Sequence, residues 1–206
     1  MLAALHAIAA GYLGGIGVAA MRASLSRFVM DFEHTPGRLN FHDAGAFRFL
    51  VDYAHNPDGI AKLCEFVDRL QPAGRKLVAF SCAGYNPDSI IVGNAHAAAG
   101  HFDAYVCYNF RTNCEKGYVE VPHVLARALK ERGVPPGRVF VEQGASDAFD
   151  RICGLAQPGD LVVFLPGHSD RARIWARVVS GDFPAVGSAL RDDRGYAGEA
   201  RVQARL

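Results

Sequence analysis

The chain lacks the short motifs that mark the commonest nucleotide and hydrolase sites. Its 206 residues contain no GxxxxGK(S/T) phosphate loop, no GxGxxG after the first strand-like run, no HExxH and no GxSxG. A phosphate loop holds ATP through backbone amides and a lysine. Its absence from the sequence predicts that this chain alone does not hydrolyse ATP by the usual P-loop route.

The sequence also has no excess of one charge and no closely spaced pair of cysteines. Lys and Arg number 22 and Asp and Glu 21, so the formal net charge is +1 and no basic surface for nucleic acid is expected. The five cysteines include no CxxC pair and mostly lie in apolar runs, which predicts reduced core thiols in a cytoplasmic protein. A zinc site from Cys107, Cys114 and a nearby histidine is the alternative. His96 and His101 do not share a helix face, and we expect no metal site.

The amino-terminal stretch MLAALHAIAAGYLGGIGVAAM lacks the features of a targeting signal. No positive charge precedes its apolar residues, and Gly11, Gly14, Gly15 and Gly17 interrupt them. The same interruptions argue against a membrane span. The pattern predicts an Ala-rich helix, a turn and a second helix over residues 18–28. We expect a cytoplasmic protein without membrane contact.

From residue 45 onward, strand-like apolar runs alternate with helix-type segments. The predicted strands cover 47–51, 77–80, 104–110, 139–141 and 161–165, and the predicted helices cover 57–70, 87–100, 121–132, 146–156 and about 169–180. Runs such as LVVFL are apolar on both faces, as in a parallel sheet covered on both sides. Regular alternation implies right-handed βαβ crossovers. The sequence therefore predicts an α/β fold with a Rossmann-like open, mostly parallel sheet and flanking helices, preceded by a short helical segment.

Punctuation residues set the expected boundaries. Asn56 is the predicted N-cap before Pro57, Asn86 repeats that arrangement before the second helix, and Ser146 is the predicted cap of the fourth. Residues 31–40 form a polar linker that contains a Pro-Gly turn. We expect three parts: a helical segment over 1–35, the Rossmann-like domain over 36–182, and a flexible tail over 183–206 that is rich in charge and glycine.

A crowded polar turn, LVDYAHNPDG (50–59), follows the first predicted strand of the sheet. Ligands of open α/β sheets bind outside the carboxyl ends of the strands, where this turn lies. Asp52 suits a ribose hydroxyl, although a turn carboxylate explains it equally well. Tyr53 can line an adenine pocket or belong to the core. His55 and Asn56 offer donors and acceptors for a base or ribose, and Asn56 can also cap a helix.

Other polar residues near the predicted strand ends have both a ligand and a structural interpretation. Arg38 suits a phosphate oxygen, or it is a solvated linker arginine. The turn SCAGYNPD (81–88) before a helix N-terminus can hold an anion near Gly84 and Asp88, or it is a plain βα turn. His168 and Asp170 close the last strand as a polar pair or as a capped turn, and as a pair they support the hypothesis of an independent hydrolase.

Two of these segments together resemble a known family. TPGRLN (35–40) and VDYAHNPDGI (51–60) are similar to the start of the carboxy-terminal domain of Mur ligases, and within that family to the corresponding part of cyanophycin synthetases. LAALHAIAAGYLGGIGVAAMRASLSRF (2–28) resembles the last helices of the family's central domain. PGDLVVF (158–164) resembles its last long strand. The resemblance covers roughly residues 2–180.

The resemblance implies an ATP-dependent amide ligase. Members of the family join an amine to a carboxylate through an acyl phosphate made from ATP, and their carboxy-terminal domain closes over a nucleotide held mainly by the central domain. It implies that Arg38 reaches the nucleotide, that Asp52 lies at the ribose and that His55 and Asn56 lie beside the adenosine. ATP is then the cofactor, with magnesium supplied by a central domain, most of which this sequence lacks. We expect no tight nucleotide binding by this chain alone.

The sequence also departs from the family pattern. The family's Gly-Asp-Arg turn after the second strand falls at residues 81–88, where only Asp88 is a counterpart. We therefore expect one wall of a ligase nucleotide site that is inactive in isolation, with catalytic residues and amino-acid substrate unassigned. The alternative is a non-catalytic partner or regulatory module that docks on a separate P-loop ligase subunit, or on a second copy, through residues 1–30.

Overall fold

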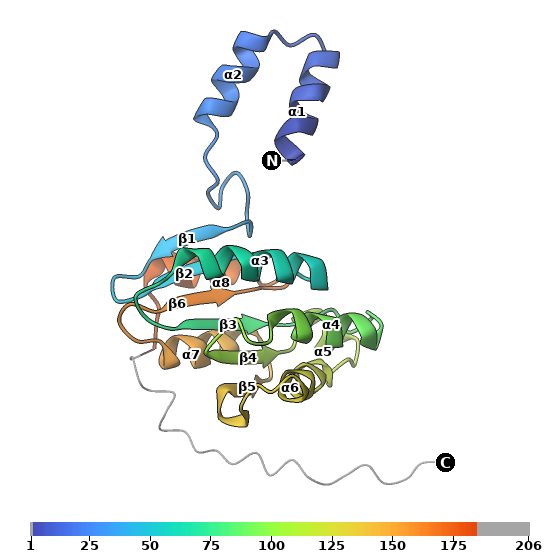
Figure 1. Ribbon diagram of the computed structural model, residues 1–206, viewed down its shortest axis with the longest axis vertical. Helices are drawn as coiled ribbons and strands as arrows, with labels where there is room; N and C mark the ends of the chain where they lie inside the picture. The colour runs from blue at the N-terminus through green and yellow to red at the C-terminus, as the bar shows by residue number, and fades with distance from the viewer. Residues whose placement is uncertain (1, 185–206) are drawn as a thin grey trace.

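The computed structural model describes residues 2–184 and shows a six-stranded sheet between two layers of helices (Figure 1). The strand order is β1-β2-β6-β3-β4-β5, with β1 antiparallel to β2 and every other neighbouring pair parallel. The strands are β1 (Asn40–Asp43), β2 (Arg48–Val51), β3 (Lys76–Phe80), β4 (Ala104–Tyr108), β5 (Val139–Glu142) and β6 (Leu161–Phe164). The predicted Rossmann-like, mostly parallel sheet is confirmed.

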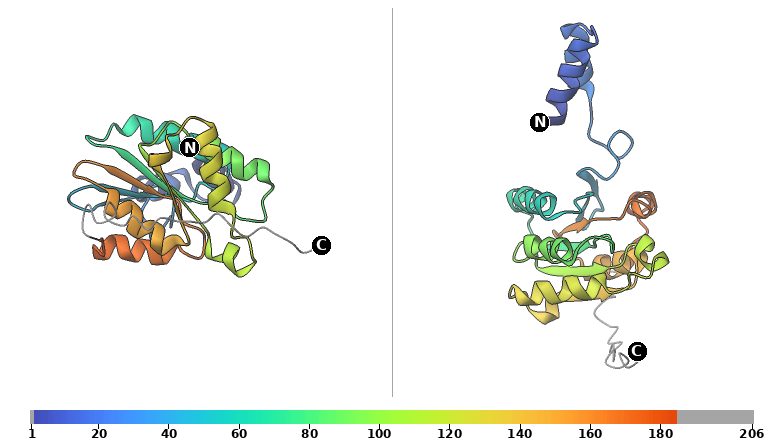
Figure 2. Two further views of the ribbon diagram at one scale, coloured as in Figure 1. Left: turned by 90° about the horizontal axis from the view of Figure 1, so that it is seen from below. Right: turned by 90° about the vertical axis from the view of Figure 1, so that its right-hand side faces the viewer.

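Helices cover both faces of the sheet (Figure 2). One layer contains α3 (Pro57–Leu70), α4 (Asp88–Ala98) and α6 (Val121–Glu131), and the other contains α7 (Ala145–Leu155) and α8 (Arg171–Ser180). A short helix, α5 (Arg111–Glu115), follows β4, and a 3₁₀ turn over Pro136–Arg138 precedes β5. The helices predicted from residue 45 onward are all present, with ends shifted by one or two residues.

The strands are apolar on both sides because each side faces a helix layer. Leu50, Val78 and Val163 pack towards α3, α4 and α6, whereas Val51 and Phe164 pack towards α7 and α8. These side chains are 1% exposed or less. Full burial of a side chain of this size contributes about 1.5–3 kcal/mol, so the two core layers fix the positions of the strand ends.

One strand was not predicted, and two predicted helix caps were wrong. Residues 40–43 form β1, an edge strand that begins at the last residue of the predicted linker and lies outside the predicted strands. Ser146 does not cap α7, which begins at Ala145 after Gly144 with no side-chain cap. Asn86 does not cap α4 either, because Pro87 occupies that position and the Asn86 amide contacts Cys82 Sγ at 3.3 Å. The Asn56 cap is confirmed by its Oδ1, which accepts a hydrogen bond from Gly59 N at 2.8 Å.

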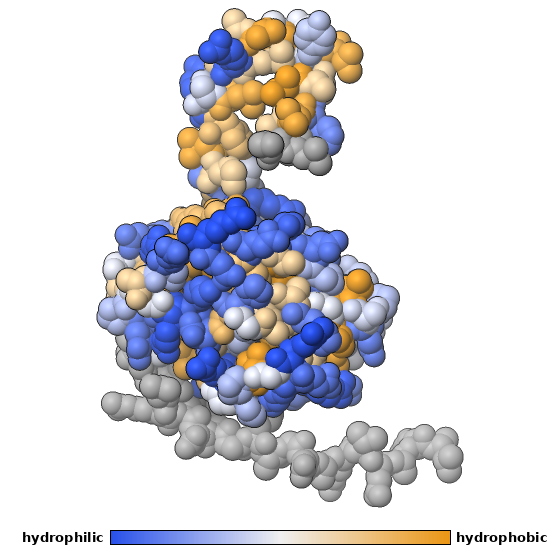
Figure 3. All heavy atoms as spheres, viewed as in Figure 1, coloured by the Kyte–Doolittle hydropathy of each residue, from blue (hydrophilic) through white to orange (hydrophobic). Residues whose placement is uncertain are grey.

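The two amino-terminal helices, α1 (Leu2–Leu13) and α2 (Val18–Arg27), form a hairpin that projects from the sheet domain (Figure 1). Met21 packs against Gly11, and the two helices enclose a small apolar hollow. Ten of the fifteen exposed large hydrophobic residues in the described part of the chain lie in residues 5–30. Figure 3 shows this apolar surface above a mainly hydrophilic domain face. Within residues 2–184, no helix has the length and apolar character that a membrane crossing requires.

The division into a helical part, a domain and a tail stays a prediction, and residues 185–206 of the predicted tail lie outside the described residues. All five cysteines are free thiols. Cys64, Cys82, Cys107 and Cys153 are buried, as predicted for most of them, whereas Cys114 on α5 is exposed. Burial raises the pKa of the Cys64 thiol to about 12, so this thiol is neutral and unreactive at ordinary pH.

Candidate functional site

The carboxyl ends of β2, β6, β3 and β4 meet at one edge of the sheet, because these strands are parallel neighbours. The candidate residues 52–56 follow β2, the turn 81–88 follows β3, and 166–170 follows β6. The linker arginine, Arg38, approaches the same edge from the amino side of β1. The structure therefore brings together side chains that the sequence had only suggested one by one.

Asp52 fixes the path of the linker. Its Oδ2 accepts a hydrogen bond from Leu39 N at 3.0 Å and its Oδ1 accepts one from Ala54 N at 2.8 Å. Leu39 has a φ of +49°, an uncommon conformation for a residue with a side chain, and the Asp52 bond holds it there. Burial raises the pKa of the Asp52 carboxyl, while the amides of Leu39 and Ala54 and the charge of Arg38 oppose this rise. Each oxygen keeps a lone pair for a further donor such as a hydroxyl.

Arg38, Tyr53 and His55 form a stack. The Arg38 guanidinium carbon lies 5.1 Å from the centre of the Tyr53 ring, and the Tyr53 and His55 ring centres are 4.8 Å apart with their planes tilted by 36°. Arg38 Nη1 also donates to Tyr53 O at a long 3.4 Å. Arg38 and His55 remain exposed, and Tyr53 is half-buried. The stack presents aromatic surface next to a cation, an arrangement that suits a flat base and an anionic group.

Helix α3 begins at this stack. Asn56 caps it, and the backbone carbonyl of His55 accepts a bond from Asn94 Nδ2 of α4 at 3.3 Å. Asn94 is buried, and Pro57 packs against Gly93 of the same helix. These contacts hold the 52–56 turn on two helices. Asn56 thus has the structural role that the sequence allowed, and its contact with a nucleotide stays a prediction.

The turn after β3 is held by a side chain that sequence reasoning missed. Asn113 of α5 accepts a bond from Gly84 N and donates one to Cys82 O, both at 2.7 Å. A side chain at Gly84 would collide with Tyr118. The Gly84 amide therefore has a partner within the chain, and the anion-binding role of this turn stays a prediction. Its partner lies 29 residues away, which left no local signal in the sequence.

A cavity of about 360 Å³ opens beside this turn. Gly84, Asp88, Tyr118, Glu120 and Arg127 contribute to its walls. Its lining combines carboxylates with a guanidinium, so an ionic ligand fits its chemistry better than an apolar one. Gly84 and Asp88, singled out in the sequence, thus share one cavity, and Arg127 and Glu120 of the α6 region join them.

The turn after β6 shows neither of the two interpretations of His168 and Asp170: they do not form a polar pair, and Asp170 precedes α8 without making a side-chain cap bond. Asp170 is buried and its Oδ1 forms an ion pair with Arg173 at 2.7 Å, whereas His168 is exposed. Asp170 Oδ2 and, after β4, Asn109 Oδ1 are buried without a hydrogen-bond partner. Buried polar atoms nearly always have partners. These two oxygens at the ligand edge are further candidate contacts; the sequence had suggested Asp170 but gave no indication of Asn109.

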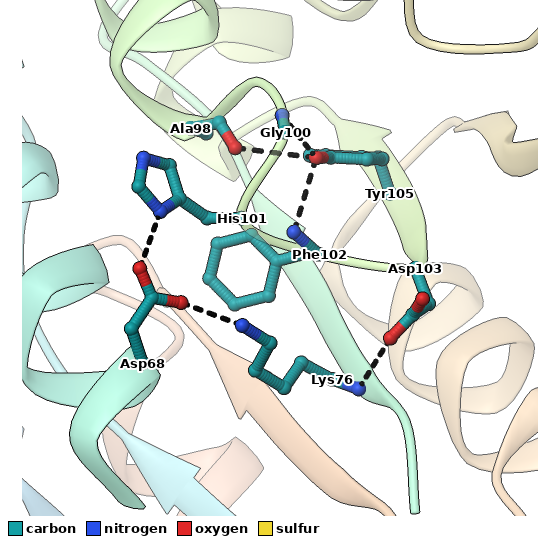
Figure 4. Close-up of polar contacts among 8 residues, drawn as sticks. All are labelled: Asp68, Lys76, Ala98, Gly100, His101, Phe102, Asp103 and Tyr105. Carbon is teal, nitrogen blue, oxygen red and sulfur yellow. Dashed lines mark hydrogen bonds and ion pairs between the residues drawn. The ribbon is translucent and has the colours of Figure 1, made fainter. Parts of the chain in front are cut away.

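The opposite edge of the sheet also carries a cavity, of about 350 Å³, but its polar groups are largely paired within the chain. Asp68 binds both Lys76 Nζ (2.5 Å) and His101 Nδ1 (2.7 Å), and Asp103 Oδ2 accepts from Lys76 N at 2.9 Å (Figure 4). The Tyr105 hydroxyl binds the loop between α4 and β4 through Ala98, Gly100 and Phe102. These hydrogen bonds and ion pairs therefore stabilise the fold at the amino edge of the sheet.

The sequence model of a protein family, the glutamate ligase domain of Mur ligases, matches residues 37–168 of this chain. The chain therefore belongs to the Mur ligase family. Cyanophycin synthetase from Trichormus variabilis is 29% identical over 173 residues, which are 82% of this chain and 18% of that protein. The predicted resemblance to Mur ligases and to cyanophycin synthetases is confirmed.

A diaminopimelate ligase is similar as well. The UDP-N-acetylmuramoyl-L-alanyl-D-glutamate–2,6-diaminopimelate ligase of Syntrophomonas wolfei is 27% identical over 189 residues, 91% of this chain and 37% of that protein. The chain spans less than two fifths of the length of either of these two relatives.

Solved structures show the same fold. A murein peptide ligase from Psychrobacter arcticus has a TM-score of 0.59 and 23% identity, over 86% of this chain and 35% of that one. Mycobacterium tuberculosis folylpolyglutamate synthase, complexed with ADP and AMPPCP, has a TM-score of 0.55 and 22% identity, over 79% of this chain and 35% of that one.

Proposed function

We propose that residues 36–182 form one wall of the nucleotide site of an ATP-dependent amide ligase similar to cyanophycin synthetase. The observation that carries the proposal is the stack of Arg38, Tyr53 and His55 beside Asp52, at the carboxyl end of β2. This edge is where open α/β sheets bind their ligands. Membership of the Mur ligase family and a fold shared with an ADP-complexed folylpolyglutamate synthase support it.

Each residue has a role that its geometry permits. Arg38 is exposed and donates to a phosphate oxygen, while Asp52 accepts a ribose hydroxyl with its remaining lone pairs. Tyr53 and His55 offer ring surface to the adenine. Asn56, which caps α3, holds this surface in place. The amine or carboxylate substrate then lies nearer the cavity of Gly84 and Asp88.

The residues that the structure describes do not form a metal site of their own. Within residues 2–184 there is no group of three His, Cys, Asp or Glu side chains that could hold a metal ion. A P-loop region would then bind the metal and make most of the phosphate contacts, and this sequence contains no such motif. The chain contributes the adenosine side of the site and one cation.

Weak nucleotide binding is the first expected result. With adenosine contacts and one arginine, we expect ADP to bind with a Kd on the order of 1 mM, which corresponds to about −4 kcal/mol. A two-dimensional amide NMR titration with ADP measures this, and the shifted signals should be those of residues 38 and 52–56. Arg38→Ala should weaken binding about tenfold, the loss expected for one charge-assisted hydrogen bond.

The matched control is Arg138→Ala, which removes the same charge from the opposite edge, where Arg138 is exposed. Its titration should equal that of the parent protein. Asp52→Ala is a poor test because it also releases Leu39 and Ala54. Absence of any shift at residues 52–56 in the parent protein, or equal affinity for the two arginine variants, would sink the nucleotide-wall proposal.

Absence of ligase turnover is the second expected result. The acyl phosphate step needs the γ-phosphate held and neutralised, and this sequence has no phosphate loop. Phosphate release from ATP in the presence of amino acids should therefore stay at the level of a protein-free blank. ATP-dependent amide formation by the pure chain would contradict this expectation.

The exposed apolar hairpin favours a second function. The chain then acts as a non-catalytic partner that docks through residues 1–30 on a separate P-loop ligase subunit, or on a second copy of itself. The exposed Leu13, Val18 and Val29 support such a contact. Co-purification with a P-loop protein whose ligase activity depends on this chain would favour the partner role.

The proposed use of ATP and the five free thiols fit a cytoplasmic location.

A further inference from the structure

The linker that carries Arg38 lies against helix α8, which is far from it in the sequence. The rings of Phe32 in the linker and Trp175 in α8 are stacked, with centres 4.8 Å apart and planes 5° from parallel. His42 of β1 meets the same indole edge-on at 6.2 Å. Both Phe32 and Trp175 are half-buried by this contact. Offset-stacked and edge-to-face aromatic pairs stabilise a contact beyond the effect of the area they bury.

A second contact joins the linker to α8 one turn earlier. Arg171 Nη1 donates to Pro36 O at 3.1 Å. The aliphatic part of Arg171 lies so close to Gly37 that a Cβ there would be 2.5 Å from Arg171 Cδ. Gly37 has a φ of +72°, a conformation that glycine adopts without strain. Arg171 therefore covers the backbone of the Pro-Gly turn and binds its carbonyl.

The contacts continue without a gap from Arg171 to Arg38. The buried Asn40 accepts with its Oδ1 from Gly37 N at 2.6 Å and from Arg38 N at 3.2 Å, and donates to Thr35 O at 3.1 Å. Arg38 then extends over Tyr53. The backbone at Arg38 is thus set by the Pro-Gly turn, which Arg171 holds. An exposed arginine on an unfixed loop would lose more conformational entropy when it binds an anion.

We propose that Arg171 and Trp175 clamp the linker 32–37 onto α8, and that Arg171 is thereby a positioning residue for Arg38 in the nucleotide site. This inference rests on the proposed nucleotide role of Arg38. The clamp makes the linker part of the sheet domain as far back as Phe32. Helix α8 follows the turn after β6, so the clamp also fixes the position of the linker relative to that turn at the ligand edge.

The clamp can be tested without any ligand because Trp175 is the single tryptophan of the chain. Its emission and its quenching by acrylamide report whether Phe32 covers the indole, and Arg171 binds the linker that carries Phe32. Arg171→Ala and Phe32→Ala should both shift the emission to longer wavelength and increase quenching. Arg138→Ala should leave both quantities unchanged. Unfolding midpoints of all variants establish that the emission is compared between folded proteins.

The positioning role is tested by ADP titration of the same variants. Arg171→Ala should weaken ADP binding about tenfold, and Phe32→Ala about threefold, as expected for loss of one or two weak contacts that order the arginine. Phe32 carries no charge, so its effect separates positioning from loss of positive potential. Arg171→Lys, which keeps the charge and one donor, should restore part of the affinity and of the fluorescence.

The fluorescence tests the clamp, and the ADP titration tests the positioning role and the nucleotide function. Unchanged fluorescence in both Arg171→Ala and Phe32→Ala overturns the clamp. Changed fluorescence with unchanged ADP affinity overturns the positioning role and leaves a structural contact. If the parent protein does not bind ADP, the nucleotide function and the positioning role both fail, while the fluorescence still shows whether the clamp exists.

Discussion

Replacing Asp160 with alanine is expected to lower the free energy of unfolding by about 2–4 kcal/mol. The Asp160 side chain is 2% exposed. Its Oδ1 accepts from Arg75 N at 2.7 Å, and its Oδ2 accepts from Arg75 Nη2 at 2.7 Å and from Gln157 N at 2.9 Å. Alanine leaves these donors without their acceptor, and each unsatisfied buried donor costs about 1–3 kcal/mol.

The position of Asp160 explains why the loss is not confined to one turn. Asp160 ends the turn before β6 and binds the residue that precedes β3, so it joins neighbouring strands at the amino edge. Gly74 lies directly against this carboxylate. The Arg75 side chain is 39% exposed, so water can solvate its guanidinium in the variant. The expected loss of about 2–4 kcal/mol is therefore somewhat smaller than the loss of about 3–5 kcal/mol for breaking a fully buried ion pair.

Urea denaturation followed by circular dichroism measures this difference. The matched control is Glu65→Ala, which breaks the exposed Lys62–Glu65 pair, also at 2.7 Å. Because exposed pairs contribute about 0–1 kcal/mol, the control should remain close to the parent protein. Equal stability of the two variants would show that the buried Asp160 carboxylate does not contribute the expected free energy of unfolding.

The sheet could be predicted from the sequence because its strands are apolar on both faces. LVVF of β6 and AYVCY of β4 are buried along their whole length, so the run of apolar residues marks each strand directly. β1 gave no such signal. Its residues, NFHD, include one buried side chain, Asn40, and the strand is fixed by antiparallel pairing with β2 at the edge. Pairing between segments is a tertiary property, and local pattern does not report it.

The cap predictions differ in the same way. Asn56 is an N-cap because a local sequence, Asn-Pro-Asp-Gly, is sufficient to place its side chain near Gly59 N. Ser146 and Asn86 have suitable side chains, but their helices start at Ala145 and Asp88 without a side-chain cap. The packing of these helices on the sheet decides where they begin.

The candidate site was predictable where its residues are close in sequence. Asp52, Tyr53 and His55 occupy one turn, and the resemblance of the Pro-Gly-Arg linker added Arg38. Arg171 could not be found in this way, since 135 residues separate it from Pro36. Its contact depends on the strand order, which places β6 beside β2 and so α8 near the linker.

Replacing Asn113 with alanine is expected to lower the free energy of unfolding by about 2–4 kcal/mol and to open the turn after β3. Asn113 is 1% exposed, and its amide makes two hydrogen bonds of 2.7 Å, one from Gly84 N and one to Cys82 O. Its loss leaves one buried donor and one buried acceptor unsatisfied, at about 1–3 kcal/mol each. Helix α5 has only five residues and makes little stability of its own.

Hydrogen exchange and denaturation together measure this effect. The amides of residues 83–86 and 114–120 should exchange at least tenfold faster, because about 1.4 kcal/mol of local stability corresponds to a factor of ten. Thr112→Ala, at an exposed neighbouring position on α5, is the control and should exchange like the parent protein. Faster exchange over the whole domain, with no excess in these segments, would contradict a local role for Asn113.

The Asn113 variant also tests which part of the edge belongs to the substrate. Tyr118 lies on Gly84 and lines the cavity with Asp88 and Arg127, so the cavity should change shape when α5 is released. The Arg38–Tyr53–His55 stack follows β2 and shares no contact with Asn113 among the described hydrogen bonds. ADP affinity should therefore stay within about twofold of the parent value, well below the factor of ten that 1.4 kcal/mol represents. A tenfold loss of ADP affinity would place the nucleotide at the Gly84 turn and away from the stack.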